Sequence, residues 1–143
     1  MKPVLVVGLG NSLMGDDGVG WRVAEWLTSD PRLPPDTEVI FGGTDLLSCA
    51  AQMEGRRRVI VLDAVQSSAP PGAVSRVNLA EAEQVQENVH QLSAPQAIQL
   101  LKLVLPARFE LLGISVSAAR LAPELSSELA EMLPAIVDRV LEE

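Results

Sequence analysis

The sequence is poor in the side chains that carry most cofactor and nucleic-acid chemistry. Its 143 residues include one cysteine, Cys49, one histidine, His90, and no tyrosine, and aromatic residues make up 3% of the chain. A single cysteine excludes an internal disulfide and a Cys-x-x-Cys metal clamp, so we expect a cytoplasmic protein. Scarce aromatics disfavour the stacking platforms that bind single-stranded nucleic acid. Any mechanism that needs an imidazole must use His90.

Positive charge and long apolar runs are also in short supply. The chain has 11 Lys and Arg against 19 Asp and Glu, a formal net charge of −8. A field of this sign repels phosphate backbones and anionic lipids, so neither nucleic acid nor a membrane is expected as a partner. No apolar run has the length of a signal-peptide core or a bilayer span. The basic cluster Arg56 to Arg58 is expected on a solvated edge, because charge runs usually lie at the surface.

Apolar runs alternate with helical patterns along the whole chain. Its length is that of one domain, so residues 1–143 are predicted to form a single domain. Strands are predicted at 4–7, 37–41, 57–62 and 109–116, with a short edge strand within 73–78. Helices are predicted at 19–27, 46–53 and 95–105 and from Pro123 onward, the last kinked at Pro134. This pattern indicates an α/β fold of three layers, a mostly parallel twisted sheet of about five strands with helices on both faces.

Acidic residues follow two of the predicted strands. Folds of this kind bind ligands outside the carboxyl ends of their strands, where Asp63 and the glycine-rich connection carrying Asp16 and Asp17 are expected. One aspartate of the pair is enough to cap the following helix, which leaves the other for function. Two carboxylates from separate loops suit a divalent cation, and the imidazole of His90 would shift the preference toward zinc, nickel or iron. Asp17, Asp63 and His90 are therefore a candidate three-ligand set that leaves metal positions open.

The same residues admit other interpretations. A glycine-rich loop can cradle a phosphate, but Leu13 stands where the dinucleotide motif needs its third glycine, and Asp16 and Asp17 stand where a P-loop needs Lys and Ser or Thr. Receiver domains also pair acids, but directly after the first strand and with a lysine after the last. A non-catalytic flavodoxin-like or receiver-like binding module is the alternative to an enzyme. Cys49 lacks the neighbours of a thiol nucleophile and is expected to be a buried small residue.

Five short motifs follow one another along the chain. They are Gly8-x-Gly10-Asn11, Asp16-Asp17-Gly18-x-Gly20, Gly42-Gly43-Thr44 followed by Leu46-Leu47, Asp63-Ala64, and His90-Gln91-Leu92. In this order and spacing they resemble the hydrogenase maturation protease family, over about residues 4–105. Enzymes of this family remove a C-terminal peptide from the large subunit of nickel-iron hydrogenases after nickel is inserted. The resemblance implies a metal-dependent endopeptidase whose partner is a nickel-iron hydrogenase large-subunit precursor.

The resemblance also implies roles for individual residues. The metal-contacting and catalytic positions fall on Asp17, Asp63 and His90, and a substrate-recognition loop falls on Gly42, Gly43 and Thr44. Gly10, Asn11 and Asp16 belong to the loop beside this site. The implied metal is nickel brought by the substrate, with zinc or cadmium able to occupy the same site. A monomer is expected.

Three positions depart from the family pattern. Phe41 stands where many members have an acid before the glycines, and Ser93 stands where a glycine often follows the His-Gln-Leu motif. In the segment Gly113 to Ser117, the Gly-Ile continues with Ser115-Val116-Ser117, where the family commonly has an acid or a proline-containing turn. These departures bear on which hydrogenase is the partner.

Overall fold

The protein is built on one five-stranded sheet. The computed structural model describes residues 1–10, 18–79, 93–116 and 125–143. Within them the elements run β1 (Val4–Leu9), α1 (Val19–Thr28), β2 (Thr37–Gly43), η2 (Leu46–Cys49), α2 (Ala50–Met53), β3 (Arg58–Gln66), β4 (Val74–Arg76), α4 (Ala94–Val104), β5 (Arg108–Val116) and α5 (Ser127–Glu142). The strand order is β2-β1-β3-β5-β4, and every neighbouring pair is parallel except β4 and β5. The predicted mostly parallel sheet is confirmed.

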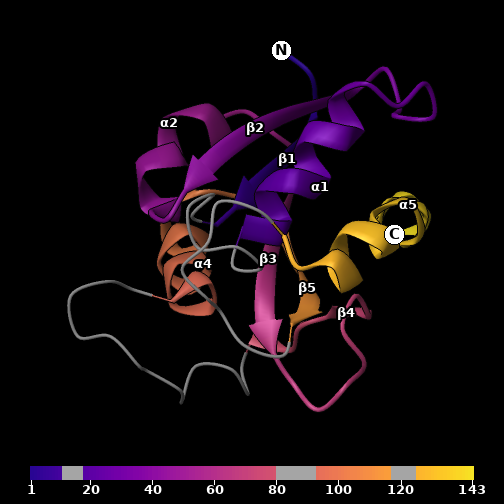
Figure 1. Ribbon diagram of the computed structural model, residues 1–143. Helices are drawn as coiled ribbons and strands as arrows, with labels where there is room; N and C mark the ends of the chain where they lie inside the picture. The colour runs from indigo at the N-terminus through magenta and orange to yellow at the C-terminus, as the bar shows by residue number, and fades with distance from the viewer. Residues whose placement is uncertain (11–17, 80–92, 117–124) are drawn as a thin grey trace.

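Helices cover both faces of the sheet, as predicted (Figure 1). Side chains alternate along a strand, so Val6 and Leu62 pack with α1 and α5 while Val7 and Val61 pack with η2, α2 and α4. The two apolar clusters explain why β1 and most of β3 are buried on both faces and read as continuous aliphatic runs. No helix in the described part of the chain is long and apolar enough to cross a bilayer.

Three strands extend further than the sequence predicts, and β1 is one of them, since it runs to Leu9. β2 includes Gly42 and Gly43, which were expected to stop it, and β3 continues through Asp63 to Gln66. β3 continues because β5 keeps pairing with it as far as Gln66. Pairing of β3 with β1, by contrast, stops at Leu62. Asp63 therefore lies within β3, at its first residue beyond the ladder with β1, and not in a turn.

Helix starts also differ from the predicted positions. Ser93 caps α4 through a capping box with Gln96, so the helix begins before Pro95. Asp45 caps the next segment by accepting the Leu47 N–H, but that segment is a short 3₁₀ helix followed by a single α turn, not one helix. α5 begins at Ser127 and runs on through Pro134 to Glu142. The predicted irregular segment 81–91 lies outside the described residues.

Direct backbone contact fixes the first turn of α1 on the sheet. A Cβ at Gly20 would lie 2.4 Å from the carbonyl oxygen of Leu62 and 2.5 Å from that of Leu9. A Cβ at Gly8 would lie 2.6 Å from the Cβ of Ala24. Because side-chain carbons do not approach other heavy atoms this closely, only glycine allows the helix to sit here. The start of α1 is thereby held against the carboxyl ends of β1 and β3.

The prediction that the whole basic cluster Arg56 to Arg58 is solvated is wrong, because Arg56 is buried. Arg56 is 7% exposed, and its guanidinium donates to the carbonyls of Gln52 and Lys2 and pairs with Glu38 at 2.8 Å. These partners compensate the cost of burying the charge. Arg57 is exposed as expected. The sequence could not reveal the difference, because the partners of Arg56 come from three separate segments.

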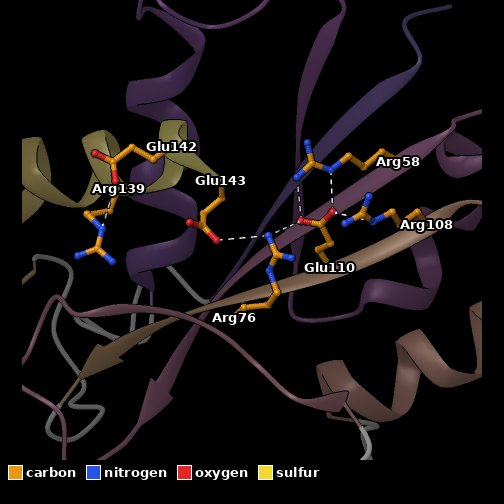
Figure 2. A network of polar contacts seen from close by, with 7 residues as sticks. All are labelled: Arg58, Arg76, Arg108, Glu110, Arg139, Glu142 and Glu143. Atoms are coloured by element: carbon orange, nitrogen blue, oxygen red, sulfur yellow. Dashed lines mark hydrogen bonds and ion pairs between the residues drawn. The ribbon is translucent and has the colours of Figure 1, made fainter.

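A second arginine group surrounds Glu110 at the amino end of the sheet (Figure 2). Glu110 is 5% exposed and accepts two 2.8 Å hydrogen bonds from Arg58. Arg108 and Arg76 approach the same carboxylate at 3.2 and 3.3 Å. These partners, Arg58 first, hold the pKa of Glu110 below its usual range. Arg76 also contacts Glu143 at 3.3 Å, so the network ties β3, β4 and β5 to the residue that follows α5.

The glycine contact predicts that Gly20→Ala is strongly destabilising. The added methyl group must displace two backbone carbonyls, so we expect the free energy of unfolding to fall by about 3 kcal/mol. Urea unfolding followed by circular dichroism measures this change. Glu25→Ala, on the exposed face of the same helix, is the control and should change stability by less than about 0.5 kcal/mol. Equal stability of the two variants would contradict the close contact.

The Glu110 network predicts a pH-dependent loss of stability in Glu110→Gln. At neutral pH we expect the free energy of unfolding to fall by about 2 kcal/mol, because three arginines lose a charged partner. The folded-state pKa of Glu110 is depressed, so its contribution is present above the usual value of 4.5 and is lost as the pH falls through the folded-state pKa. Urea unfolding at several pH values should show the difference shrinking below 4.5. The exposed pair partner Glu142 supplies the control, Glu142→Gln, which should show neither effect.

Candidate active site

Asp63 lies at the carboxyl edge of the sheet, where the sequence places a candidate ligand. It is half-buried, and its Oδ1 accepts the N–H of Ala64 at 2.9 Å. Val59 and Val61 of the same strand face the cluster that contains α4, so alternation puts Asp63 on that face too. The carboxylate therefore lies beside the carboxyl end of β1, where the pairing between β1 and β3 stops.

The predicted loop residue Gly10 and the predicted substrate-binding residue Gly43 are brought into contact. The Gly10 N–H donates to the Gly43 carbonyl at 2.8 Å. Both residues have positive φ, 133° and 59°, which side-chain-bearing residues rarely adopt. Among the described residues, no atom lies within 4 Å of the position that a Cβ of Gly43 would take. The backbone at the end of β2 is therefore anchored to β1 on one side and open on the other.

The Gly42–Thr44 segment and Asp63 flank the end of β1. Gly8 pairs with Phe41 on one side and with Leu62 on the other, so two inter-strand spacings, about 10 Å, separate β2 from β3 here. Gly42 lies against Val7 and Leu9, on the same face as Asp63. Thr44 is exposed in the turn that follows. This arrangement brings the predicted substrate loop and the predicted metal ligand to one edge of the sheet.

Four predicted site residues lie outside the described residues: Asn11, Asp16, Asp17 and His90. Their described neighbours are informative. The N-cap position of α1 is Gly18, directly after the aspartate pair, rather than one of the aspartates. Ser93, three residues after His90, is the N-cap of α4. Among the described residues, no three His, Cys, Asp or Glu side chains gather as a metal site, so the three-ligand set stays a prediction.

Both helices that follow these segments begin at the carboxyl edge. The Gly20 contact holds the first turn of α1 against Leu62, the residue before Asp63. Three residues separate the end of α4 from Arg108, the first residue of β5. The end of α4 therefore lies near the amino ends of the strands, and its 11 residues place its start toward their carboxyl ends. The two helices that follow Asp17 and His90 in the sequence thus begin on the two faces of the sheet, with Asp63 on the strand between them.

Cys49 is placed as a structural residue, as predicted. It is 5% exposed, and its Sγ would lie 3.3 Å from a Cβ at Gly42. Burial raises the pKa of the Cys49 thiol by more than a hydrogen bond with Ser48 lowers it, and the nearby charge of Asp45 adds a smaller rise. A protonated, buried thiol is a poor nucleophile, so the chemistry of the site does not come from Cys49.

A cavity of about 340 Å³ lies at the opposite edge of the sheet from Asp63. Aliphatic side chains such as Val6, Leu27 and Val140 line it, with Arg57 and Arg58 among its polar groups. Its position at the amino ends of β1 and β3 separates it from the predicted site residues. The predicted site residues that the structure describes do not line this cavity.

An aromatic contact beside the site was missed by sequence reasoning. The rings of Trp21 and Phe41 are 4.7 Å apart at their centroids and inclined by 38°. In the sequence, Phe41 stood out only as a departure from the family pattern, and no pattern pointed to Trp21. The available signal was rarity, because the chain has two Trp and two Phe, and one of each meets here.

Comparison with known proteins identifies relatives along nearly the whole chain. The hydrogenase maturation protease family matches residues 21–143. The hydrogenase 2 maturation protease of Escherichia coli is 27% identical over 144 residues, which cover 96% of this chain and 88% of that protein. A solved hydrogenase 2 maturation peptidase from a Thaumarchaeota archaeon is 32% identical with a TM-score of 0.70, covering 99% of this chain and 97% of the other.

A second solved structure shares the fold at lower identity. It is the hydrogenase maturating endopeptidase HybD of Escherichia coli, which is 23% identical with a TM-score of 0.80 and covers 97% of this chain and 90% of the other. The resemblance drawn from the five motifs is therefore confirmed, and protease activity follows from it at the level of the family. By the extent of the family match and the similarity to the archaeal peptidase, this chain belongs to the hydrogenase maturation protease family.

Proposed function

We propose that this chain is the endopeptidase that removes the C-terminal extension of a nickel-iron hydrogenase large-subunit precursor after nickel insertion. Family membership supports the protease activity, and the relative in Escherichia coli is named as the maturation protease of hydrogenase 2. The observation that carries the proposal is that Asp63 and the Gly10–Gly43 contact lie on the two sides of the carboxyl end of β1. The family assignment favours this function over a non-catalytic flavodoxin-like or receiver-like module.

Asp17, Asp63 and His90 are the proposed catalytic and metal-binding residues. The support from the fold is indirect for two of them, since Gly18 and Ser93 place the starts of α1 and α4 at the edge that Asp63 occupies. Two carboxylates and one imidazole form a donor set that suits nickel, and zinc or cadmium could take the same ligands. We treat nickel as part of the substrate, carried by the precursor and used as the signal that it is ready for cleavage.

The chain would hold the precursor at this edge while the peptide bond is hydrolysed. A metal bound there can polarise the scissile carbonyl or lower the pKa of a water molecule. Asp17, Asp63 and His90 would fix the position of that metal relative to the peptide. Gly43 leaves its backbone open, and Thr44 presents an exposed hydroxyl, so both can hydrogen-bond to an extended peptide. We propose that the enzyme works as a monomer in the cytoplasm.

The role of the carboxylates predicts that Asp63→Asn and Asp17→Asn each abolish cleavage. We expect at least a hundredfold lower rate on nickel-loaded precursor, because an amide is a weak metal ligand and carries no charge. Cleavage is followed by the mobility shift of the large subunit on a gel, and thermal melting checks that each variant folds. Asp138→Asn, which removes an exposed carboxylate paired with Arg32, is the control. Normal cleavage by Asp63→Asn would rule out its assigned role.

The ligand set further predicts that His90→Ala weakens metal binding. Calorimetric titration of the isolated protein with cadmium should give at least a tenfold higher Kd for His90→Ala than for the unmodified chain. Cys49→Ala is the informative control, because cadmium favours thiolates but Cys49 is buried with a raised thiol pKa. Cys49→Ala should bind cadmium and cleave precursor normally. If it loses either property while His90→Ala keeps both, the assignment of ligands is wrong.

A further inference from the structure

We propose that the C-terminal segment of the precursor binds as an added strand along the outer edge of β2, with an apolar side chain against Trp21 and Phe41. This inference rests on the proposed function and names how the same site takes its peptide. Adding a strand to a free sheet edge is a common way to bind an extended peptide, since the backbone hydrogen bonds require no particular sequence. The geometry of β2 carries the proposal.

β2 is the first strand in the sheet order, so only β1 pairs with it among the described strands (Figure 1). The hydrogen bond from the Val4 N–H to the Asp36 carbonyl sets the phase of the parallel ladder. In that phase the N–H groups of Glu38 and Ile40 point toward β1, and those of Val39 and Phe41 point away from it. The outer edge therefore presents alternate donors and acceptors to a further strand.

As far as Phe41, this edge lacks the features that usually prevent pairing. A register shift in the β1 ladder leaves Gly42 as a bulge, so the regular free stretch ends before it. Exposed edges are commonly short or carry charges and proline. The opposite edge strand, β4, has three residues, whereas β2 has seven. The one charged side chain in β2 is Glu38, and it is engaged by Arg56 at 2.8 Å. From Val39 to Phe41 the edge is uncharged and free of proline, which suits it to a partner strand.

The outer side of β2 ends at the same end of the sheet as the candidate active site. β2 ends at Gly43, whose carbonyl accepts the Gly10 N–H, and β1 alone separates this end from Asp63. A peptide aligned along β2 would therefore continue onto the edge where the proposed ligands lie. The added strand would hold the precursor on one side of the site, and the residues that continue from it would cross the ends of β2 and β1 to reach Asp63.

The aromatic pair gives this edge a preference among side chains. Phe41 is 39% exposed and packs against Trp21 from the first turns of α1. Side chains directly opposite in neighbouring strands lie about 5 Å apart, so a residue of the added strand would meet the exposed part of the Phe41 ring. An apolar residue gains most from that contact. We therefore assign the precursor segment an apolar residue at this position.

Amide hydrogen exchange tests the added strand in the complex of nickel-loaded precursor with Asp63→Asn, which should hold it uncleaved. Exchange is read residue by residue by mass spectrometry. The amides of Val39 and Phe41 should slow at least tenfold on binding, while those of Glu38 and Ile40, already bonded to β1, should not change. A complex that leaves Val39 and Phe41 unprotected overturns the proposal. Protection of both in the free chain, together with a dimeric mass, would instead assign the edge to a second copy and equally overturn it.

Steady-state cleavage tests the aromatic contact. Phe41→Ala should raise KM about fivefold with little change in kcat, and Phe41→Leu should restore most of the loss. Trp26→Ala, which removes an aromatic ring of similar exposure elsewhere on α1, is the matched control and should leave both constants unchanged. Equal effects of Phe41→Ala and Trp26→Ala would contradict the contact. If the unmodified chain fails to cleave the precursor at all, the proposed function fails first and this inference falls with it.

Discussion

The contact of Gly20 with the carbonyl oxygens of Leu9 and Leu62 is the constraint on which the site depends. It places the first turn of α1 directly on the carboxyl ends of β1 and β3. A larger residue would push the start of the helix outward, away from β1 and β3. The helix start, the end of β1 and the carboxylate on β3 are thus held together by backbone packing, which varies less than contacts between long side chains.

The two edges of the sheet have different roles. At the amino edge, Glu110 and the arginines around it join β3, β4, β5 and the end of the chain through charged hydrogen bonds. At the carboxyl edge, Asp63 lies beyond the ladder with β1, and Gly43 presents open backbone. The stabilising charges are placed away from the site, so the carboxyl edge can carry groups suited to a metal and a peptide.

The sequence predicted the three layers, the mostly parallel sheet and the end of the sheet on which Asp63 lies. These could be predicted because aliphatic periodicity and the residues next to strands are local features. It placed Asp63 after β3, whereas the strand continues because β5 pairs with it beyond Leu62, a long-range effect. The burial of Arg56 and the Trp21–Phe41 contact were also beyond local patterns, since their partners come from distant segments. The family resemblance, which the comparisons confirm, implies the same three ligands that the positions after the strands suggest, and that ligand set stays a prediction.

The central claim is that this chain cuts a hydrogenase large-subunit precursor only when nickel is present. Intact-mass spectrometry of the purified precursor, incubated with the chain before and after nickel loading, tests it most directly. We predict that the nickel-loaded form loses the mass of its C-terminal extension in a single cut, while the nickel-free form keeps its full mass. Cleavage of both forms at the same rate, or of neither, would contradict it.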